Sequence, residues 1–232
     1  MQGMGMYERE RKVPGNGQCK IRVTRMKVDN ENTVFEWYEN NRKEKEMLGM
    51  MIEEKEKKLF IAHSSDDAEY VEAFVELLED LGMKEQEIVC SSIPPYCVPL
   101  DNGVYEWLVS QFQHCDLHVV YFLSENYYSS VASMNEMGAA WAMKHKWTAM
   151  LMPGFPFDKV RGCIDKTKIG IKLDDIDKRT LNYRLIELKN NLIKEFNLSE
   201  VSESRWERKR DSFLNEIAKI ASNRSLENEA MK

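Results

Sequence analysis

Short hydrophobic runs alternate with longer amphipathic segments between residues 58 and 198. This alternation is typical of an α/β fold, in which buried strands are connected by helices. Five runs have the length and composition of buried strands. These runs are Lys58 to Ala62, Glu87 to Ser91, Leu117 to Leu123, Thr148 to Met152 and Ile169 to Leu173. The pattern therefore predicts a five-stranded parallel sheet flanked by helices.

Four segments between and after these strands have helical periodicity. The first lies between the first two strands, where Asp66 and Glu69 are spaced as a cap and Gly82 marks the end. A strand, a helix and a strand at this spacing indicate a right-handed parallel crossover. The other three predicted helices are Val104 to Gln113, about Ser130 to Lys144, and Asp177 to Phe196. Ligands of open parallel sheets bind beyond the carboxyl ends of the strands, so the loops after Ala62, Ser91 and Leu123 are where a site is expected.

The α/β segment has an extension on each side. Residues 1–32 lack apolar periodicity and are predicted to form a flexible arm, and 33–57 begin with a capping-box spacing and are predicted to form a helix. Residues 58–198 form the predicted main domain. Residues 199–232 form a predicted C-terminal helix and tail, in which Ser204-x-x-Glu207 opens a helix over about 205–222. We interpret this last helix as an appendage to the α/β domain.

Charge, cysteines and hydropathy narrow the class of protein. The chain of 232 residues carries 33 Lys and Arg against 39 Asp and Glu, which argues against a nucleic-acid-binding protein. The five cysteines are scattered and never spaced as Cys-x-x-Cys, so neither a disulfide framework nor a zinc site is predicted. No apolar stretch is long enough to span a bilayer or to act as a signal peptide. We expect a cytoplasmic protein without a membrane partner.

The sequence lacks the motifs of several common classes of nucleotide-binding proteins and enzymes. There is no Gly-x-Gly-x-x-Gly after the first strand, no P-loop and no Gly-x-Ser-x-Gly. His114, Cys115 and His118 crowd together at the start of a buried strand, where alternate residues face opposite ways, so no metal site is predicted. Asp66 and Asp67 follow the first strand as response-regulator acids do, but the third strand ends without an aspartate. We therefore interpret Asp66 as a helix cap.

Three stretches together resemble the Toll/interleukin-1 receptor (TIR) domain in its bacterial form. Their order and spacing make the match, which covers about residues 58–198. The stretches are Leu59-Phe60-Ile61-Ala62-His63-Ser64-Ser65-Asp66, the loop from Ser92 to Gly103, and Val119 to Ser130 followed by Asn135-Glu136-Met137-Gly138-Ala139-Ala140-Trp141. The resemblance implies a flavodoxin-like TIR fold.

Many TIR domains cleave the nicotinamide glycosidic bond of NAD, and the family's catalytic glutamate lies on the helix after the third strand, where this chain has Glu136. Nicotinamide leaves as a neutral base, so no general acid is needed, and one carboxylate can stabilise the oxocarbenium-like ribose. The resemblance thus implies that NAD is the substrate and that no cofactor is required. A competing interpretation is that Ser133-x-x-Glu136 is only a capping box.

The positions of five other residues in the sequence predict further contacts with the substrate. His63, Ser64 and Ser65 lie at the turn after the first strand and could hydrogen-bond ribose or phosphate. Gly103 and Tyr105 match the family's loop end, where Tyr105 could stack on a ring of the nucleotide or, alternatively, pack against its own domain.

The chain departs from the family at one position close to Glu136. Active relatives often carry tryptophan four residues before the glutamate, but this chain has Ala132. Trp141 points to a different face and is predicted to lie in the core.

Three functions remain open. The first is an NAD hydrolase or ADP-ribosyl cyclase, which the resemblance places in bacterial antiphage defence and which would be activated by self-association through the loop from Ser92 to Gly103. The second is a TIR scaffold without enzymatic activity, in which Glu136 is a cap. The third is an enzyme like the nucleoside deoxyribosyltransferases, which also use a glutamate at a glycosidic bond.

Overall fold

The computed structural model describes residues 55–168 and 170–230, with side chains through 227. The predicted arm at 1–32 and nearly all of the predicted helix at 33–57 lie outside the described residues. Glu56 and Lys57, placed at the end of that helix, instead begin the first strand.

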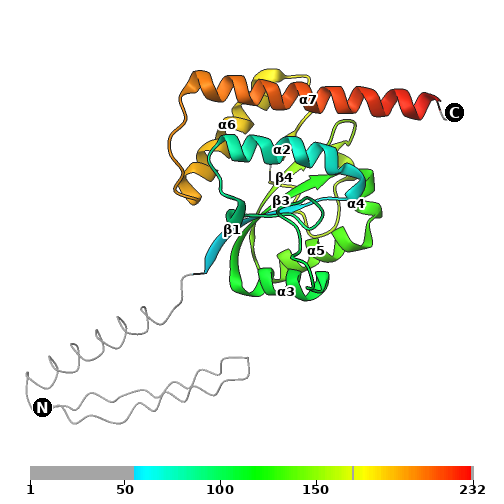
Figure 1. The fold of residues 1–232 in the computed structure, drawn as a ribbon. Coiled ribbons are helices and arrows are strands. Elements are labelled where there is room, and N and C mark those ends of the chain that lie inside the picture. Colours follow the sequence, from blue (N-terminus) through cyan, green and yellow to red (C-terminus); the bar gives the residue numbers. More distant parts are fainter. Residues whose placement is uncertain (1–54, 169, 231–232) are drawn as a thin grey trace, which may run out of the picture. The chain divides into compact units, whose positions relative to one another are not determined.

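Five strands form one parallel sheet in the order β2-β1-β3-β4-β5 (Figure 1). This order is that of the flavodoxin-like fold, so the predicted fold class is confirmed. The two edge strands are shorter than predicted. The strands are β1 (Glu56–Ala62), β2 (Ile88–Val89), β3 (Cys115–Leu123), β4 (Lys146–Leu151) and β5 (Ile171–Lys172).

All four helices predicted within the α/β segment are present. A short helix between β3 and α5 was missed, and Ser124 caps it by accepting the backbone N–H of Tyr127 at 2.9 Å. The helices are α2 (Ala68–Asp80), α3 (Val104–His114), the short α4 (Glu125–Ser129), α5 (Val131–Ala142) and α6 (Lys178–Glu195). Single 3-10 turns lie at Ser65–Asp67, Glu85–Glu87 and Phe157–Lys159.

The start of α2 differs from its prediction. Asp66 lies inside the 3-10 turn that precedes α2, and the N-cap residue Asp67 makes no side-chain cap hydrogen bond. The interpretation of Asp66 as the cap is therefore wrong. The predicted end of the helix is confirmed, because Gly82 adopts a φ of +93° that other residues rarely tolerate.

Alternate residues of the sheet face two separate cores. Leu59 and Ile61 pack on the side of α2 and α6, whereas Phe60 and Ala62 pack on the side of α3 and α5. Figure 1 shows these helices covering the two faces of the sheet. This arrangement explains why the strand sequences are almost continuously apolar, as expected of a parallel sheet buried on both faces.

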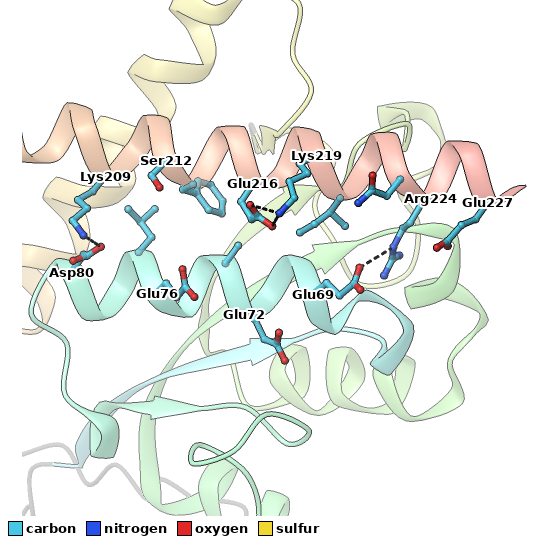
Figure 2. A pocket seen from close by; sticks show the side chains of 15 residues that line it. Glu69, Glu72, Glu76, Asp80, Lys209, Ser212, Glu216, Lys219, Arg224 and Glu227 are labelled. Carbon is cyan, nitrogen blue, oxygen red and sulfur yellow. Dashed lines mark hydrogen bonds and ion pairs between the residues drawn. The ribbon is translucent and has the colours of Figure 1, made fainter.

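The C-terminal helix α7 (Glu203–Ala230) starts before and ends after the predicted 205–222. Ser204 lies within the helix, so its predicted role as the cap is wrong. Trp206, Phe213 and Ile217 are at most 4% exposed and belong to the core on the α2 side. Figure 2 shows α7 lying along α2. The helix predicted as an appendage is thus part of the hydrophobic core. None of the helices within the described part of the chain is both long and apolar enough to cross a membrane.

Candidate functional site

A pocket of about 320 Å³ lies between α3 and α5. Ser91, two positions after the end of β2, also lines it. The wall is largely apolar, and its polar exceptions come mainly from α5. The lining residues are Ser91, Val104, Tyr105, Leu108, Val109, Phe112, Ala132, Asn135, Glu136 and Ala139. The pocket therefore adjoins one of the three loops singled out at the carboxyl ends of the strands.

Glu136 is the acidic group of this pocket. Glu136 is only 9% exposed, and burial raises the pKa of its carboxyl to about 8. Within residues 55–168 and 170–227, no group forms a hydrogen bond or an ion pair with this carboxyl. Burial without a partner disfavours the charged form, so the free carboxyl is mostly neutral at pH 7. An isolated acid of this kind, in a pocket, is typical of a functional group rather than of a structural one.

The start of α5 excludes the capping interpretation of Glu136. Ser130 is the N-cap, and its Oγ accepts the backbone N–H of Ser133 at 3.2 Å. Ser133 is consequently the third residue of the helix and cannot begin a capping box with Glu136. Glu136 lies in the second turn, and its helical position places it on the pocket face with Ala132, Asn135 and Ala139.

A second hydrogen bond of Ser133 connects α5 to the turn after β1. The Ser133 hydroxyl donates to the carbonyl oxygen of His63 at 3.0 Å, and both residues are buried. The two segments predicted from the sequence to form the site are therefore held together. Figure 1 shows the carboxyl end of β1 and the start of α5 on the same side of the sheet.

The His63 side chain is only 7% exposed and does not line the pocket. Its Nε2 lies 2.8 Å from Ser92 Oγ, and its Nδ1 lies 3.4 Å from the carbonyl oxygen of Ile61. Burial lowers the pKa of His63, and the Ile61 carbonyl and the charge of Asp67 oppose this shift. The imidazole is therefore neutral at pH 7 and interacts with Ser92 rather than projecting toward the pocket.

Cys90 lies close to both His63 and Glu136. Its Sγ is 3.9 Å from His63 Nδ1. Burial raises the pKa of the Cys90 thiol to about 12, and the Glu136 charge adds to that rise. The thiol is thus un-ionised, and a buried, un-ionised thiol is unreactive.

The remaining predicted substrate contacts differ in their placement. Ser64 is buried and Ser65 is exposed, and neither lines the pocket. Gly103 is the N-cap residue of α3 and immediately precedes the pocket residue Val104. The structure thus brings Glu136 and Tyr105 together in the pocket, whereas His63 is connected to α5 through Ser133, and Ser64 and Ser65 do not line the pocket.

Tyr105 is 70% exposed and lines the pocket, so the alternative that it packs inside its own domain is wrong. Ala132 lies on the pocket wall one helical turn before Glu136, as its spacing predicts. Trp141 is 64% exposed, and its predicted place in the core is therefore wrong. The missed lining residues Asn135 and Ala139 were detectable, because they follow Ala132 at the three- and seven-residue spacing of one helix face.

A second polar cluster, centred on Asp67, was missed. The Asp67 carboxylate is 2% exposed and accepts hydrogen bonds from Ser124 at 2.5 Å, Asn126 at 2.9 Å and Arg224 at 3.1 Å. Arg224 also donates to the carbonyl oxygen of Asp66. Figure 2 shows Arg224 reaching from α7 toward the first turn of α2. The cluster joins the turn after β1, the loop after β3 and the C-terminal helix.

The crowded residues His114, Cys115 and His118 do not converge. His118 bonds Glu195 at 2.8 Å and Thr148 at 2.9 Å, whereas Cys115 belongs to the core on the opposite face of the sheet. In the part of the chain that the structure describes, no three His, Cys, Asp or Glu residues are arranged to hold a metal ion.

The wider groove between α2 and α7 is lined by acids and bases that largely pair with one another (Figure 2). Examples are Lys209 with Asp80 at 2.7 Å and Lys219 with Glu216 at 2.9 Å. We assign the groove to helix packing rather than to chemistry.

Comparison with known proteins identifies a relative without assigning an activity. No protein-family model matches the chain. The chain is 37% identical over 161 residues to the protein named "Uncharacterized protein YddK" of Bacillus subtilis (strain 168). The aligned region covers 69% of this chain and 57% of the relative, so the chain spans little more than half the length of that protein.

Proposed function

We propose that the chain is a TIR-type NAD+ hydrolase that cleaves the bond between nicotinamide and ribose, with Glu136 as the catalytic carboxylate. The observation that carries the proposal is the position of Glu136, which lies in an apolar pocket, has no hydrogen-bond or ion-pair partner among the described residues, and has a pKa raised to about 8. The order of the sheet strands and the motifs quoted above support the TIR assignment.

The charge of NAD+ explains how a mostly neutral acid can serve this reaction. The nicotinamide ring of the substrate is a pyridinium cation, and a cation beside a buried carboxyl favours its ionised form. Binding of NAD+ next to Glu136 would therefore lower the pKa of the carboxyl and release a proton. The resulting carboxylate would stabilise the positive charge that develops on the ribose as nicotinamide departs.

Tyr105 and the start of α3 suggest how the rest of the nucleotide is held. The exposed Tyr105 ring can stack on a base or on nicotinamide at the mouth of the pocket. The first turn of α3 leaves backbone N–H groups available to a phosphate. Local N–H donors are needed because residues 58–198 carry 14 basic and 21 acidic residues.

Exposed apolar side chains around the pocket support self-association. Leu100 is 94% exposed, Val104 is 48% exposed and Val109 is 52% exposed, and all three lie on the loop after β2 or on α3. Contact with a second copy would remove this apolar surface from water. We therefore propose a homo-oligomer that is active when assembled, in a role such as bacterial antiphage defence.

The proposal is tested by incubating the purified full chain with NAD+ over a wide range of protein concentration and measuring free nicotinamide. A hydrolase releases nicotinamide, with a specific rate that rises as the protein self-associates. Self-association without nicotinamide release at any concentration would favour the scaffold instead. The absence of tryptophan at Ala132 is the feature that favours this second candidate.

A further inference from the structure

The Ser92–His63 pair has no role in the hydrolysis proposed above. Ser92 is exposed at the start of the loop after β2, and its Oγ lies 2.8 Å from the Nε2 of the buried His63. The nearest polar group to the other ring nitrogen, Nδ1, is the carbonyl oxygen of Ile61 at 3.4 Å. A carbonyl cannot donate, so the contact favours the tautomer with the proton on Nδ1 and leaves Nε2 free to accept the Ser92 proton.

This arrangement is that of an activated nucleophile. A hydroxyl that donates to a neutral imidazole, itself oriented by a third group, loses its proton readily during attack on an electrophilic carbon. Burial lowers the pKa of His63, which keeps the imidazole neutral and able to accept that proton at pH 7.

The pair lies next to the pocket of Glu136. Ser92 directly follows Ser91, which lines the pocket. The His63 carbonyl oxygen accepts a hydrogen bond from Ser133, one turn before Glu136. Cys90 Sγ lies 3.9 Å from His63 Nδ1, and the charge of Glu136 raises the pKa of the Cys90 thiol. The nucleophile is thus the residue next to a pocket-lining serine, and its histidine is connected through Ser133 to the helix that carries Glu136.

We propose that Ser92 is an acceptor for the ADP-ribosyl group and thus a site of self-modification; this inference rests on the proposed NAD+ cleavage. In the step, the bond between ribose C1′ and the nicotinamide nitrogen breaks, and a bond between C1′ and Ser92 Oγ forms. Nicotinamide leaves with the electron pair of the broken bond as a neutral base, and the hydroxyl proton passes to His63 Nε2 and then to solvent. The product is a serine O-glycoside in place of free ADP-ribose.

The test measures nicotinamide release and covalent modification of the protein in the same sample. The full chain is incubated with NAD+, free nicotinamide is quantified, and the protein is digested and analysed by peptide mass spectrometry. We expect one ADP-ribosyl group on Ser92 that survives hydroxylamine, because hydroxylamine cleaves esters of Asp and Glu but not a serine glycoside. Incubation with free ADP-ribose in place of NAD+ should leave Ser92 unmodified.

Variants distinguish modification of Ser92, assisted by His63, from modification of other serines. Ser92→Ala should abolish the adduct, and His63→Gln should lower the adduct per nicotinamide released by at least about tenfold. Ser110 is a matched control, because it is also exposed and directly follows a pocket residue, Val109. Its histidine, His114, is exposed, and the Nδ1 that lies 3.4 Å from Ser110 Oγ is closer to the Ser110 carbonyl oxygen, at 3.0 Å. Ser110→Ala should leave the adduct at Ser92 unchanged.

The outcomes are distinguishable. Nicotinamide release without an adduct on Ser92 would overturn this inference and leave the proposed function intact. An adduct that persists after His63→Gln at the wild-type ratio would refute the role of His63 as the base. No nicotinamide release would overturn the proposed function and this inference together.

Discussion

The hydroxyl of Ser133 donates a 3.0 Å hydrogen bond to the carbonyl oxygen of His63. The bond connects residues 70 positions apart, and both are buried. It fixes the first turn of α5 against the turn after β1, and thereby sets where Glu136 lies relative to the Ser92–His63 pair.

Removing this hydroxyl should loosen that attachment. Ser133→Ala leaves the buried His63 carbonyl without its donor, and such a loss costs about 1–3 kcal/mol. We expect a lower midpoint of urea unfolding and weaker nicotinamide release. Ser129→Ala, which alters an exposed serine on the preceding helix, should change stability by less than about 0.5 kcal/mol. Equal stability of the two variants would show that the bond contributes nothing.

Arg224 should stabilise the fold through Asp67. Arg224→Ala would remove one of three donors to a carboxylate that is 2% exposed, and we expect a loss of about 2 kcal/mol in the free energy of unfolding. Arg208→Ala is the matched control, because Arg208 is an exposed arginine on the same helix. Thermal and urea unfolding measure the difference, and identical values for both variants would contradict a structural role for the Asp67 cluster.

The raised pKa of Glu136 predicts a pH dependence of catalysis. The free carboxyl titrates at about 8, so kcat/KM for NAD+ should rise with pH and level off above this value. Burial lowers the pKa of His63 and raises that of Cys90 to about 12, so neither group accounts for a titration near pH 8. Initial rates between pH 6 and 9.5 test the prediction. A flat profile, or a fall with rising pH, would contradict a catalytic carboxylate at Glu136.

The same pKa predicts how stability changes with pH. The folded pKa of about 8 lies above the ordinary glutamate value of 4.5, so the unfolded chain binds fewer protons between these values and stability falls as pH rises through them. Glu136→Gln removes this effect. We expect the variant to exceed the wild type in Tm by at least about 3 °C at pH 8.5 and by much less at pH 5. A difference in Tm that is independent of pH would show that Glu136 is not desolvated.

Ala132 offers a test of substrate stacking. Ala132→Trp would place a ring on the pocket wall one turn before Glu136, where active members of the TIR family that the sequence resembles often have one. Aromatic stacking contributes about 0.5–1.5 kcal/mol, so KM for NAD+ should fall about 2- to 13-fold. Ala139→Ser, a small change on the same wall, serves as a comparison. A loss of activity in Ala132→Trp would mean that the substrate itself occupies the space beside Ala132.

The fold was predictable because its signals are local and repeated. The strand Leu117 to Leu123 is a continuous apolar run, and the helix before Gly82 has both a periodic apolar face and a residue suited to positive φ. The boundaries at Asp66 and Ser204 were wrong because a capping residue and a residue of the first turn look alike in sequence.

The site was predictable where residues share one helix face, or where the family resemblance marks a position, as it does for Tyr105 on α3. Glu136 and Ala132 share a face of α5, so their spacing placed them together. The contacts of Asp67 with Arg224 and of His63 with Ser92 join residues 157 and 29 positions apart, and no local pattern encodes them. Trp141 was assigned to the core because it lies on a different helix face from Glu136, but a face that turns away from the site can also be exposed to solvent.

The measurement that tests the central claim most directly is nicotinamide release by Glu136→Gln beside Glu125→Gln. Glu125 is an exposed glutamate on α4 that pairs with Lys159, so its change controls for the loss of a surface charge. We predict that Glu136→Gln folds with wild-type circular dichroism and releases nicotinamide at least about 100-fold more slowly, whereas Glu125→Gln retains the wild-type rate. Wild-type nicotinamide release by Glu136→Gln would contradict the account.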